Sequence, residues 1–234
     1  MKRFVLEVRN GLYIIDLAKT MQQLREAVKL LEEMVLNHRS ILFVGTKKQA
    51  KDVVRELAEE CDEFYICERW LGGTLTNLVT IRQSIKRLEK IEKKIATASD
   101  GLTKKELSLL TKEQIKLNTN LSGIRGMRKV PSLLIVVDPS KEHIAVAEAN
   151  KLSIPVMGLV DTNCDPDLIT HVIACNDDAR RSVWLILKFL AQTIKDKKNE
   201  LRAMGLKEGE ESFSDSETGE REEEEEFLVE EEKE

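Results

Sequence analysis

The 234-residue sequence predicts an α/β fold with a doubly wound parallel sheet. The first observation is that apolar runs of four to six residues alternate with stretches of helical periodicity. Strands that are buried on both faces of a parallel sheet have this continuous apolar character. The second observation is a hydrophobic content of 41%, enough for a substantial core, with no apolar run near the roughly 18 residues of a membrane span.

The first part of the chain predicts three strands. LYIIDL at 12–17 predicts a short buried strand, and Thr20 with Gln23 has the spacing of a capping box at the start of a helix. ILFVG at 41–45 predicts the next strand, followed by a second amphipathic helix. FYIC at 64–67 predicts a third strand.

Two more strands are predicted near the other end of the chain. LLIVVD at 133–138 and PVMGLVD at 155–161 predict buried strands with a helix between them. HVIACND at 171–177 precedes a final amphipathic helix. Strands that alternate with helices in this way favour parallel pairing, with helices on both faces of the sheet.

Between 76 and 130 the apolar residues recur at close to heptad spacing, which predicts an antiparallel coiled-coil hairpin of two helices inserted in the α/β domain. The returning helix carries the clearer seam, formed by Leu107, Leu110, Gln114, Leu117, Leu121 and Ile124. ASDG at 98–101 supplies the turn, and Thr103 with Glu106 predicts a capping box. Two ordinary helices that pack on the core are the alternative.

Charge is segregated along the chain. The formal net charge is −5, yet residues 206–234 alone carry 15 acidic and 3 basic residues. The segment 76–130 carries 13 basic and 5 acidic residues, which is typical of a surface that binds a polyanion. We therefore expect a discontinuous α/β domain at 1–75 and 131–205, a basic hairpin at 76–130, and a disordered acidic tail at 206–234.

The turn after the second predicted strand has the order glycine, hydroxyl, cation, helix. Gly45, Thr46, Lys47 and Lys48 stand in this order, but the second glycine of a Walker loop is missing. A helix N-terminus still attracts anions through its free N–H groups and its dipole, so these residues could take one phosphate of a nucleic-acid backbone. The alternative is that Thr46 only caps the helix and that the lysines are solvated.

A phosphate- or nucleotide-binding α/β enzyme or switch is the alternative function. Such a switch requires a cluster of acids with a lysine at the carboxyl ends of the strands. Asp16, Asp138 and Asp161 end predicted strands, but we expect them to cap loops and helices. No Ser/His/Asp or Cys/His order is evident, and the four cysteines are dispersed without a CxxC pair. The sequence therefore predicts no catalytic residues, no metal site and no cofactor.

Several longer words of the sequence resemble one protein family. They are NGLYIIDLAKT, LFVGTKKQA, ERWLGGTLTN, GLTKKE, LLIVVDP, IPVMGLVDTNCDP and IACNDDARRS. Together, and in this order from about residue 2 to 200, they resemble the small-subunit ribosomal protein S2 family of the bacterial and organellar type. The sequence begins at Met1 inside the family pattern, so either the start codon was assigned downstream of the true one or this member is truncated.

The resemblance implies a flavodoxin-like domain with a protruding coiled-coil hairpin, and no enzymatic activity. It implies a structural protein of the small (30S) ribosomal subunit in the bacterial cytoplasm, with an organellar matrix or stroma as the alternative. The implied partners are small-subunit ribosomal RNA and neighbouring ribosomal proteins, including the large ribosomal protein S1. No membrane partner is expected.

Phosphate neutralisation and shape are the expected means of RNA binding. Bases near the root of the hairpin are favoured, because the sheet fixes their positions. The expected RNA-contacting residues are Thr46, Lys47, Lys48, Arg69, Arg82, Lys86, Arg125, Arg128 and Lys129.

Overall fold

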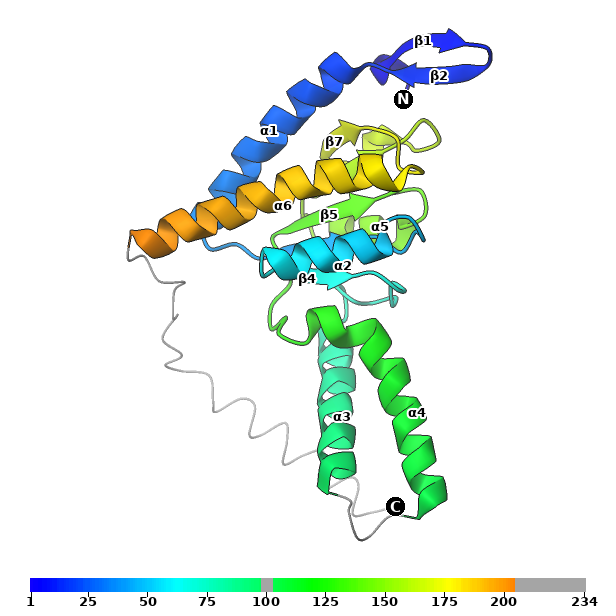
Figure 1. Cartoon of the computed structure of the whole chain (residues 1–234), viewed down its shortest axis with the longest axis vertical. Coiled ribbons are helices and arrows are strands. Elements are labelled where there is room, and N and C mark those ends of the chain that lie inside the picture. The colour runs from blue at the N-terminus through cyan, green and yellow to red at the C-terminus, as the bar shows by residue number, and fades with distance from the viewer. Residues whose placement is uncertain (98–102, 205–234) are drawn as a thin grey trace. The chain divides into compact units, whose positions relative to one another are not determined.

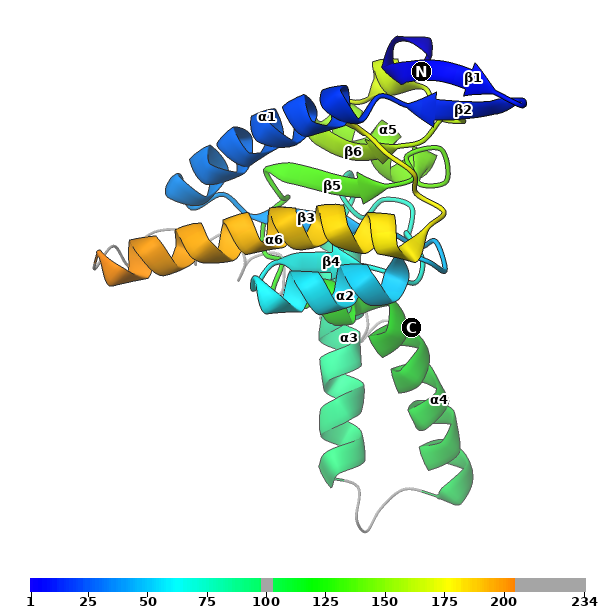
Figure 2. The same cartoon turned by 45° about the horizontal axis from the view of Figure 1, so that its top comes forward.

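The computed structural model describes residues 1–97 and 103–204, and a parallel sheet of five strands lies at its centre (Figures 1 and 2). The strands are β3 (Ile41–Val44), β4 (Phe64–Ile66), β5 (Leu133–Val137), β6 (Val156–Val160) and β7 (His171–Ala174). Their order in the sheet is β4-β3-β5-β6-β7, and every neighbouring pair is parallel. The predicted doubly wound parallel sheet is therefore confirmed.

Numbered from β3, the strand order is 2-1-3-4-5, which is the order of flavodoxin-like folds. All residues of β3, β5 and β6 are buried, which explains why these strands have continuous apolar sequences. In the centre of the sheet Ile41 pairs with Leu133, and Leu134 pairs with Val156. The winding direction reverses between β3 and β5, and folds of this kind bind ligands at that point of the carboxyl edge.

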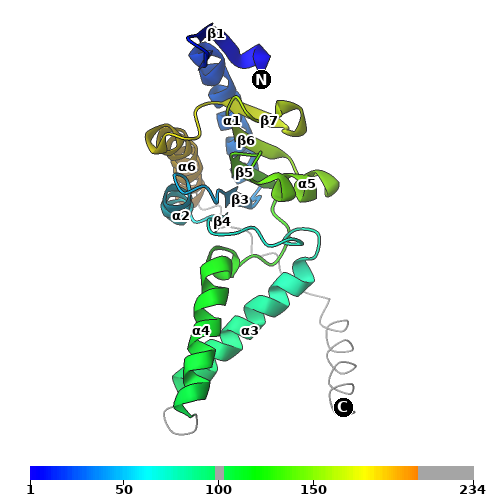
Figure 3. The ribbon, with the colours of Figure 1, turned by 90° about the vertical axis from the view of Figure 1, so that its right-hand side faces the viewer.

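Helices cover both faces of the sheet, with α2 and α6 on one face and α5 on the other (Figure 3). Their bounds are α2 (Lys51–Glu60), α5 (His143–Lys151) and α6 (Arg180–Ala203). A Cβ on Gly45 would lie 3.0 Å from Val54 Cγ2 and 3.3 Å from Ala50 Cβ, so glycine lets α2 pack close to the end of β3. None of the described helices is long and apolar enough to cross a membrane.

The N-terminal strands form a separate antiparallel pair. β1 (Val5–Arg9) and β2 (Leu12–Ile15) are joined by Asn10 and Gly11, and their side chains are exposed or half-buried. Both turn residues have positive φ, 52° and 79°, as a two-residue hairpin turn requires. The strand predicted at 12–17 exists as β2, but the prediction that it is buried was wrong, because β2 pairs only with β1. Strand β1 was not predicted from the sequence.

Helix α1 (Leu17–Leu36) begins before the predicted capping box. The Asp16 carboxylate caps it by accepting hydrogen bonds from two backbone N–H groups of the first turn, at 3.0 and 3.4 Å. Thr20 and Gln23 lie inside the helix and bind the end of β7. The Thr20 hydroxyl donates to Ala174 O (2.6 Å), and Gln23 Oε1 accepts from Ala174 N (2.9 Å). The capping-box prediction was wrong because both side chains make a tertiary contact instead.

Two helices, α3 (Leu78–Thr97) and α4 (Lys104–Leu121), leave the sheet after β4 and return to it before β5 (Figures 1 and 3). The capping box of α4 is confirmed, because Thr103 and Glu106 exchange side chain-to-backbone hydrogen bonds. The helices pack on each other, and α3 buries four apolar side chains. On α4 only Leu121 is fully buried among the described residues, so a coiled coil is not confirmed. The turn predicted at 98–101 and the predicted tail lie outside the described residues.

The root of the hairpin belongs to the hydrophobic core. Ile81 of α3 and Met127 after α4 are buried in one cluster with Ile66 of β4. Gly123 lies so close to β4 that an added Cβ would be 2.2 Å from Tyr65 O. The alternative prediction, that these helices pack on the core, therefore holds at the root of the hairpin. This packing fixes the root on the edge of the sheet.

Candidate functional site

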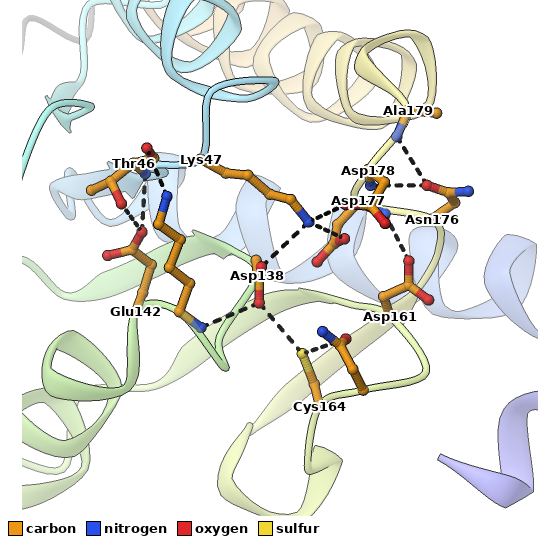
Figure 4. A network of polar contacts seen from close by, with 12 residues as sticks. Thr46, Lys47, Asp138, Glu142, Asp161, Cys164, Asn176, Asp177, Asp178 and Ala179 are labelled. Carbon is orange, nitrogen blue, oxygen red and sulfur yellow. Dashed lines mark hydrogen bonds and ion pairs between the residues drawn. The ribbon is translucent and has the colours of Figure 1, made fainter.

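The turn after β3 lies at the carboxyl edge of the sheet, where the winding direction reverses. Helix α2 begins only at Lys51, and its N-cap is Ala50, without a side-chain cap. Thr46 therefore does not cap the helix. Its backbone N–H donates to Glu142 Oε1 at 3.0 Å, and its hydroxyl donates to the same oxygen (Figure 4). Both donor groups of Thr46 are thus used within the protein.

Lys47 is surrounded by carboxylates (Figure 4). Its Nζ lies 3.4 Å from Asp138 Oδ2, 2.7 Å from Asp177 Oδ1 and 2.6 Å from Asp178 Oδ1. Burial alone would lower the pKa of Lys47, but its hydrogen bonds to Asp177 and Asp178 and the nearby negative charges raise it well above its usual value. Lys47 is therefore a fixed internal cation, and Lys48 is the exposed lysine of this turn.

The acids around Lys47 come from the ends of three parallel strands. Asp138 follows β5, Asp161 follows β6, and Asp177 follows β7. The Asp161 carboxylate accepts from the Asp177 backbone N–H at 3.2 Å, whereas Asp177 Oδ2 is buried with no hydrogen-bond partner among the described groups. Burial is the main cause that raises the pKa of Asp177 to about 6. Asp138 and Asp161 were predicted from the sequence to cap loops and helices, and Asp177 was not predicted as a functional residue.

This acidic cluster contains the residues that could hold a metal ion in the described part of the chain. Carboxylate oxygens of Asp161, Asp177 and Asp178 lie within 4.8 Å of one another, as do ligand atoms of Asp138, Cys164 and Asp177. Oxygen ligands of this kind suit hard cations. The Lys47 ammonium, however, already lies among three of these carboxylates, so an added ion competes with an existing positive charge.

The raised pKa of Asp177 predicts a specific pH dependence of stability. The folded pKa of about 6 exceeds the usual 3.8, so this contribution to stability is complete below about pH 4 and is lost as pH rises through 6. The loss amounts to at most about 3 kcal/mol. Urea unfolding between pH 4 and 7 should show it as a change in the difference between the parent and Asp177→Asn. A constant difference across this range would contradict the prediction.

A second buried carboxylate organises the loop that joins β4 to α3. Glu148 of α5 accepts hydrogen bonds from Trp70 Nε1 (3.0 Å) and from Gly73 N (2.8 Å). It also accepts from Leu75 N (3.0 Å) and from the backbone N–H and hydroxyl of Thr76 (both 3.1 Å). Burial alone would raise the pKa of Glu148, but these hydrogen bonds outweigh it and lower the pKa. Glu148 was not among the residues predicted from the sequence, although a lone carboxylate on an apolar helix face signals a buried partner.

The predicted bases of the hairpin differ in their surroundings. Arg125 donates to both carboxylate oxygens of Glu92 and to Asn118 Oδ1 (3.0 Å), so it ties α4 and its end to α3. Arg69 is exposed beside the loop that Glu148 holds. The remaining predicted bases are also exposed; they are Arg82, Lys86, Arg128 and Lys129. The structure thus brings five predicted residues to the hairpin root, while Thr46, Lys47 and Lys48 lie in the turn after β3.

Comparison with known proteins gives consistent matches over most of the chain. The family model described as Ribosomal protein S2 matches residues 1–197. Small ribosomal subunit protein uS2 of Protochlamydia amoebophila is 69% identical over 218 residues, which cover 93% of this chain and 80% of that protein. The proteins of the same name from Chlamydia trachomatis serovar D and Chlamydia pneumoniae are each 57% identical, cover 86% of this chain, and are themselves covered to 71% and 73%.

Proposed function

Because the chain belongs to the ribosomal protein S2 family, and is accordingly a structural constituent of the small ribosomal subunit, we propose that it binds small-subunit ribosomal RNA through the root of its helical hairpin. Neutralisation of backbone phosphates supplies most of the affinity, and the shape of the root sets the position of the RNA. Small-subunit ribosomal RNA and ribosomal proteins are the partners that the family implies.

The observation that carries this proposal is that acidic side chains of the hairpin are engaged in contacts within the hairpin itself. Two of them form ion pairs between the helical segments, Glu92 with Arg125 and Glu113 with Arg87. Glu106 is used in the capping box of α4. Three of the five acidic residues at 76–130 are thus engaged within the hairpin, against thirteen basic residues, and this excess of positive charge favours contact with a polyanion.

Four exposed residues near the sheet are the best candidates for phosphate contacts, and we call them the root bases. They are Arg82, Lys86, Arg128 and Lys129. Neighbouring apolar residues hold this region in the core, so little conformational entropy is lost when RNA binds. Arg125 was expected to contact RNA as well; its place in the proposal is to hold the two helices together. Lys48 and Arg69 are further exposed candidates.

The proposal assigns no catalytic activity and no nucleotide to the turn after β3, since Thr46 and Lys47 are engaged by internal carboxylates. It places the protein in the bacterial cytoplasm as part of the ribosome. The large ribosomal protein S1 is a proposed neighbour on the family resemblance alone. The exposed apolar side chains on α6, Trp184, Leu185 and Phe189, are available for protein contacts of this kind.

Binding of the purified protein to small-subunit ribosomal RNA in a salt series tests the proposal. Contact by four root bases predicts a fall in affinity of about a hundredfold between 50 and 200 mM salt, because each neutralised phosphate releases counterions. Affinity that stays constant over this range would contradict it. Saturable binding of ATP or GTP that is lost in Lys47→Ala would instead support the switch alternative.

A further inference from the structure

We infer that Glu148 is a positioning residue for RNA binding, which acts by holding the loop at residues 70–76 and, through it, the bases on either side. The inference rests on the proposed function, since it concerns bases assigned to the same RNA-binding root. Glu148 itself is buried, so the proposed role requires no direct contact between this side chain and RNA. Its effect is transmitted through the backbone of the loop.

The loop connects two groups of proposed RNA contacts. Arg69 directly precedes Trp70, whose indole N–H donates to Glu148. Thr76, at the other end of the loop, donates to the same carboxylate and lies two positions before the start of α3. Arg82 and Lys86 follow in the first turns of that helix. One carboxylate therefore fixes both ends of the loop, and with them the start of α3.

The core packing of helix α5 fixes the position of Glu148. Its helix, α5, buries Ala145, Val146 and Ala149 in the same core cluster that contains Trp70 and Leu75. The five donors to Glu148 are separated from it by 72 to 78 residues of sequence. The carboxylate is thus the long-range anchor of a loop whose other hydrogen bonds are local, such as Thr74 N to Leu71 O (3.1 Å).

The chemistry of the site requires a carboxylate. All five groups that face Glu148 donate, and an ionised carboxylate has only acceptor sites. Glutamine keeps the shape of the side chain but presents an amide N–H₂ to part of this set. A donor would then face donors, and the loop would lose hydrogen bonds at one of its two ends.

The Glu148→Gln variant distinguishes a positioning role from a purely electrostatic effect, because the two predict changes of opposite sign in RNA affinity. Removal of a negative charge alone favours RNA binding, whereas loss of positioning weakens it. We expect the salt slope of RNA binding to flatten by about two, the contribution of two phosphate contacts. Amide hydrogen exchange at Gly73, Leu75 and Thr76 should accelerate at least tenfold. Glu60→Gln is the matched control, since it removes an exposed carboxylate that pairs with Lys188 and Lys195.

Trp70→Phe provides a second variant that removes one donor and keeps the charge of Glu148. It should weaken RNA binding several-fold in the same direction and accelerate exchange mainly at the Trp70 end of the loop. Faster amide exchange in the loop of these variants, with an unchanged salt slope of RNA binding, would show that Glu148 stabilises the loop without affecting RNA binding. That result would overturn the inference. Unchanged exchange would overturn it as well. If glutamine at the root bases has no effect on RNA binding, the proposed function fails, and that result is distinct from either outcome.

Discussion

Glutamine in place of all four root bases is expected to flatten the slope of log affinity against log salt by about three. Each base that neutralises a phosphate of a duplex-like site contributes about 0.9 to this slope, and a single-stranded site contributes about 0.7. At moderate salt the same loss should weaken binding to small-subunit ribosomal RNA by one to two orders of magnitude. The fold should be retained, because these side chains are exposed and surface substitutions usually change stability by less than about 0.5 kcal/mol.

Four lysines near the tip of the hairpin form a matched control with the same change in charge. They are Lys93, Lys94, Lys104 and Lys105. Their replacement by glutamine should flatten the slope less, because the tip lies away from the core cluster that fixes the root. Filter binding or calorimetry at four or more salt concentrations measures both slopes. Equal slopes for the parent and both variants would place the RNA contact elsewhere on the protein.

Lys47→Ala is expected to lower the free energy of unfolding by about 3 kcal/mol, the largest effect that we predict for a single substitution. Removal of one partner from a buried ion pair leaves the other charge without compensation, and this costs more than loss of the attraction itself. Here Asp138 and Asp177 are both buried and both face the ammonium. Urea unfolding at pH 7 gives the difference directly.

Lys48→Ala is the control for this substitution, since it removes the same charge from the adjacent, exposed position. Its stability should stay within about 0.5 kcal/mol of the parent. The salt slope of RNA binding should rank the two variants in the opposite order. Lys48→Ala should flatten the slope, whereas Lys47→Ala should leave it unchanged in protein that is still folded. Equal stability of the two variants would mean that the acidic cluster does not depend on Lys47.

The strands of the parallel sheet could be predicted because burial on both faces leaves a local signal. ILFV and LLIVV need no knowledge of the rest of the chain to be assigned as buried strands. The run at 12–15 has a similar composition but pairs only with β1, and apolar content alone does not separate the two cases. Its Asn-Gly turn was the available signal, since this dipeptide favours a two-residue hairpin.

The candidate site could be predicted only in part, because its polar partners are distant in sequence. The sequence predicted that Lys47 contacts a phosphate. In the structure Lys47 instead pairs with Asp138 and Asp177, which the parallel sheet brings to the same edge. The acids that end β5, β6 and β7 signal such a cluster once a parallel sheet is assumed. The five donors to Glu148 could not be inferred in the same way, because they are mostly backbone groups of an irregular loop.

The place of the hairpin in the strand order also constrains how the chain can fold. β3 pairs with β5 in the centre of the sheet, so Ile41 meets Leu133 only after about ninety residues, including both hairpin helices, have been synthesised. A disordered loop of this length raises the contact order, and high contact order is associated with slow folding. Helices form from local contacts within about a microsecond. Early pairing of α3 with α4 shortens the effective loop between β4 and β5 and so reduces the entropy of its closure. The hairpin that we propose as the RNA contact would thereby also assist the folding of the sheet from which it extends.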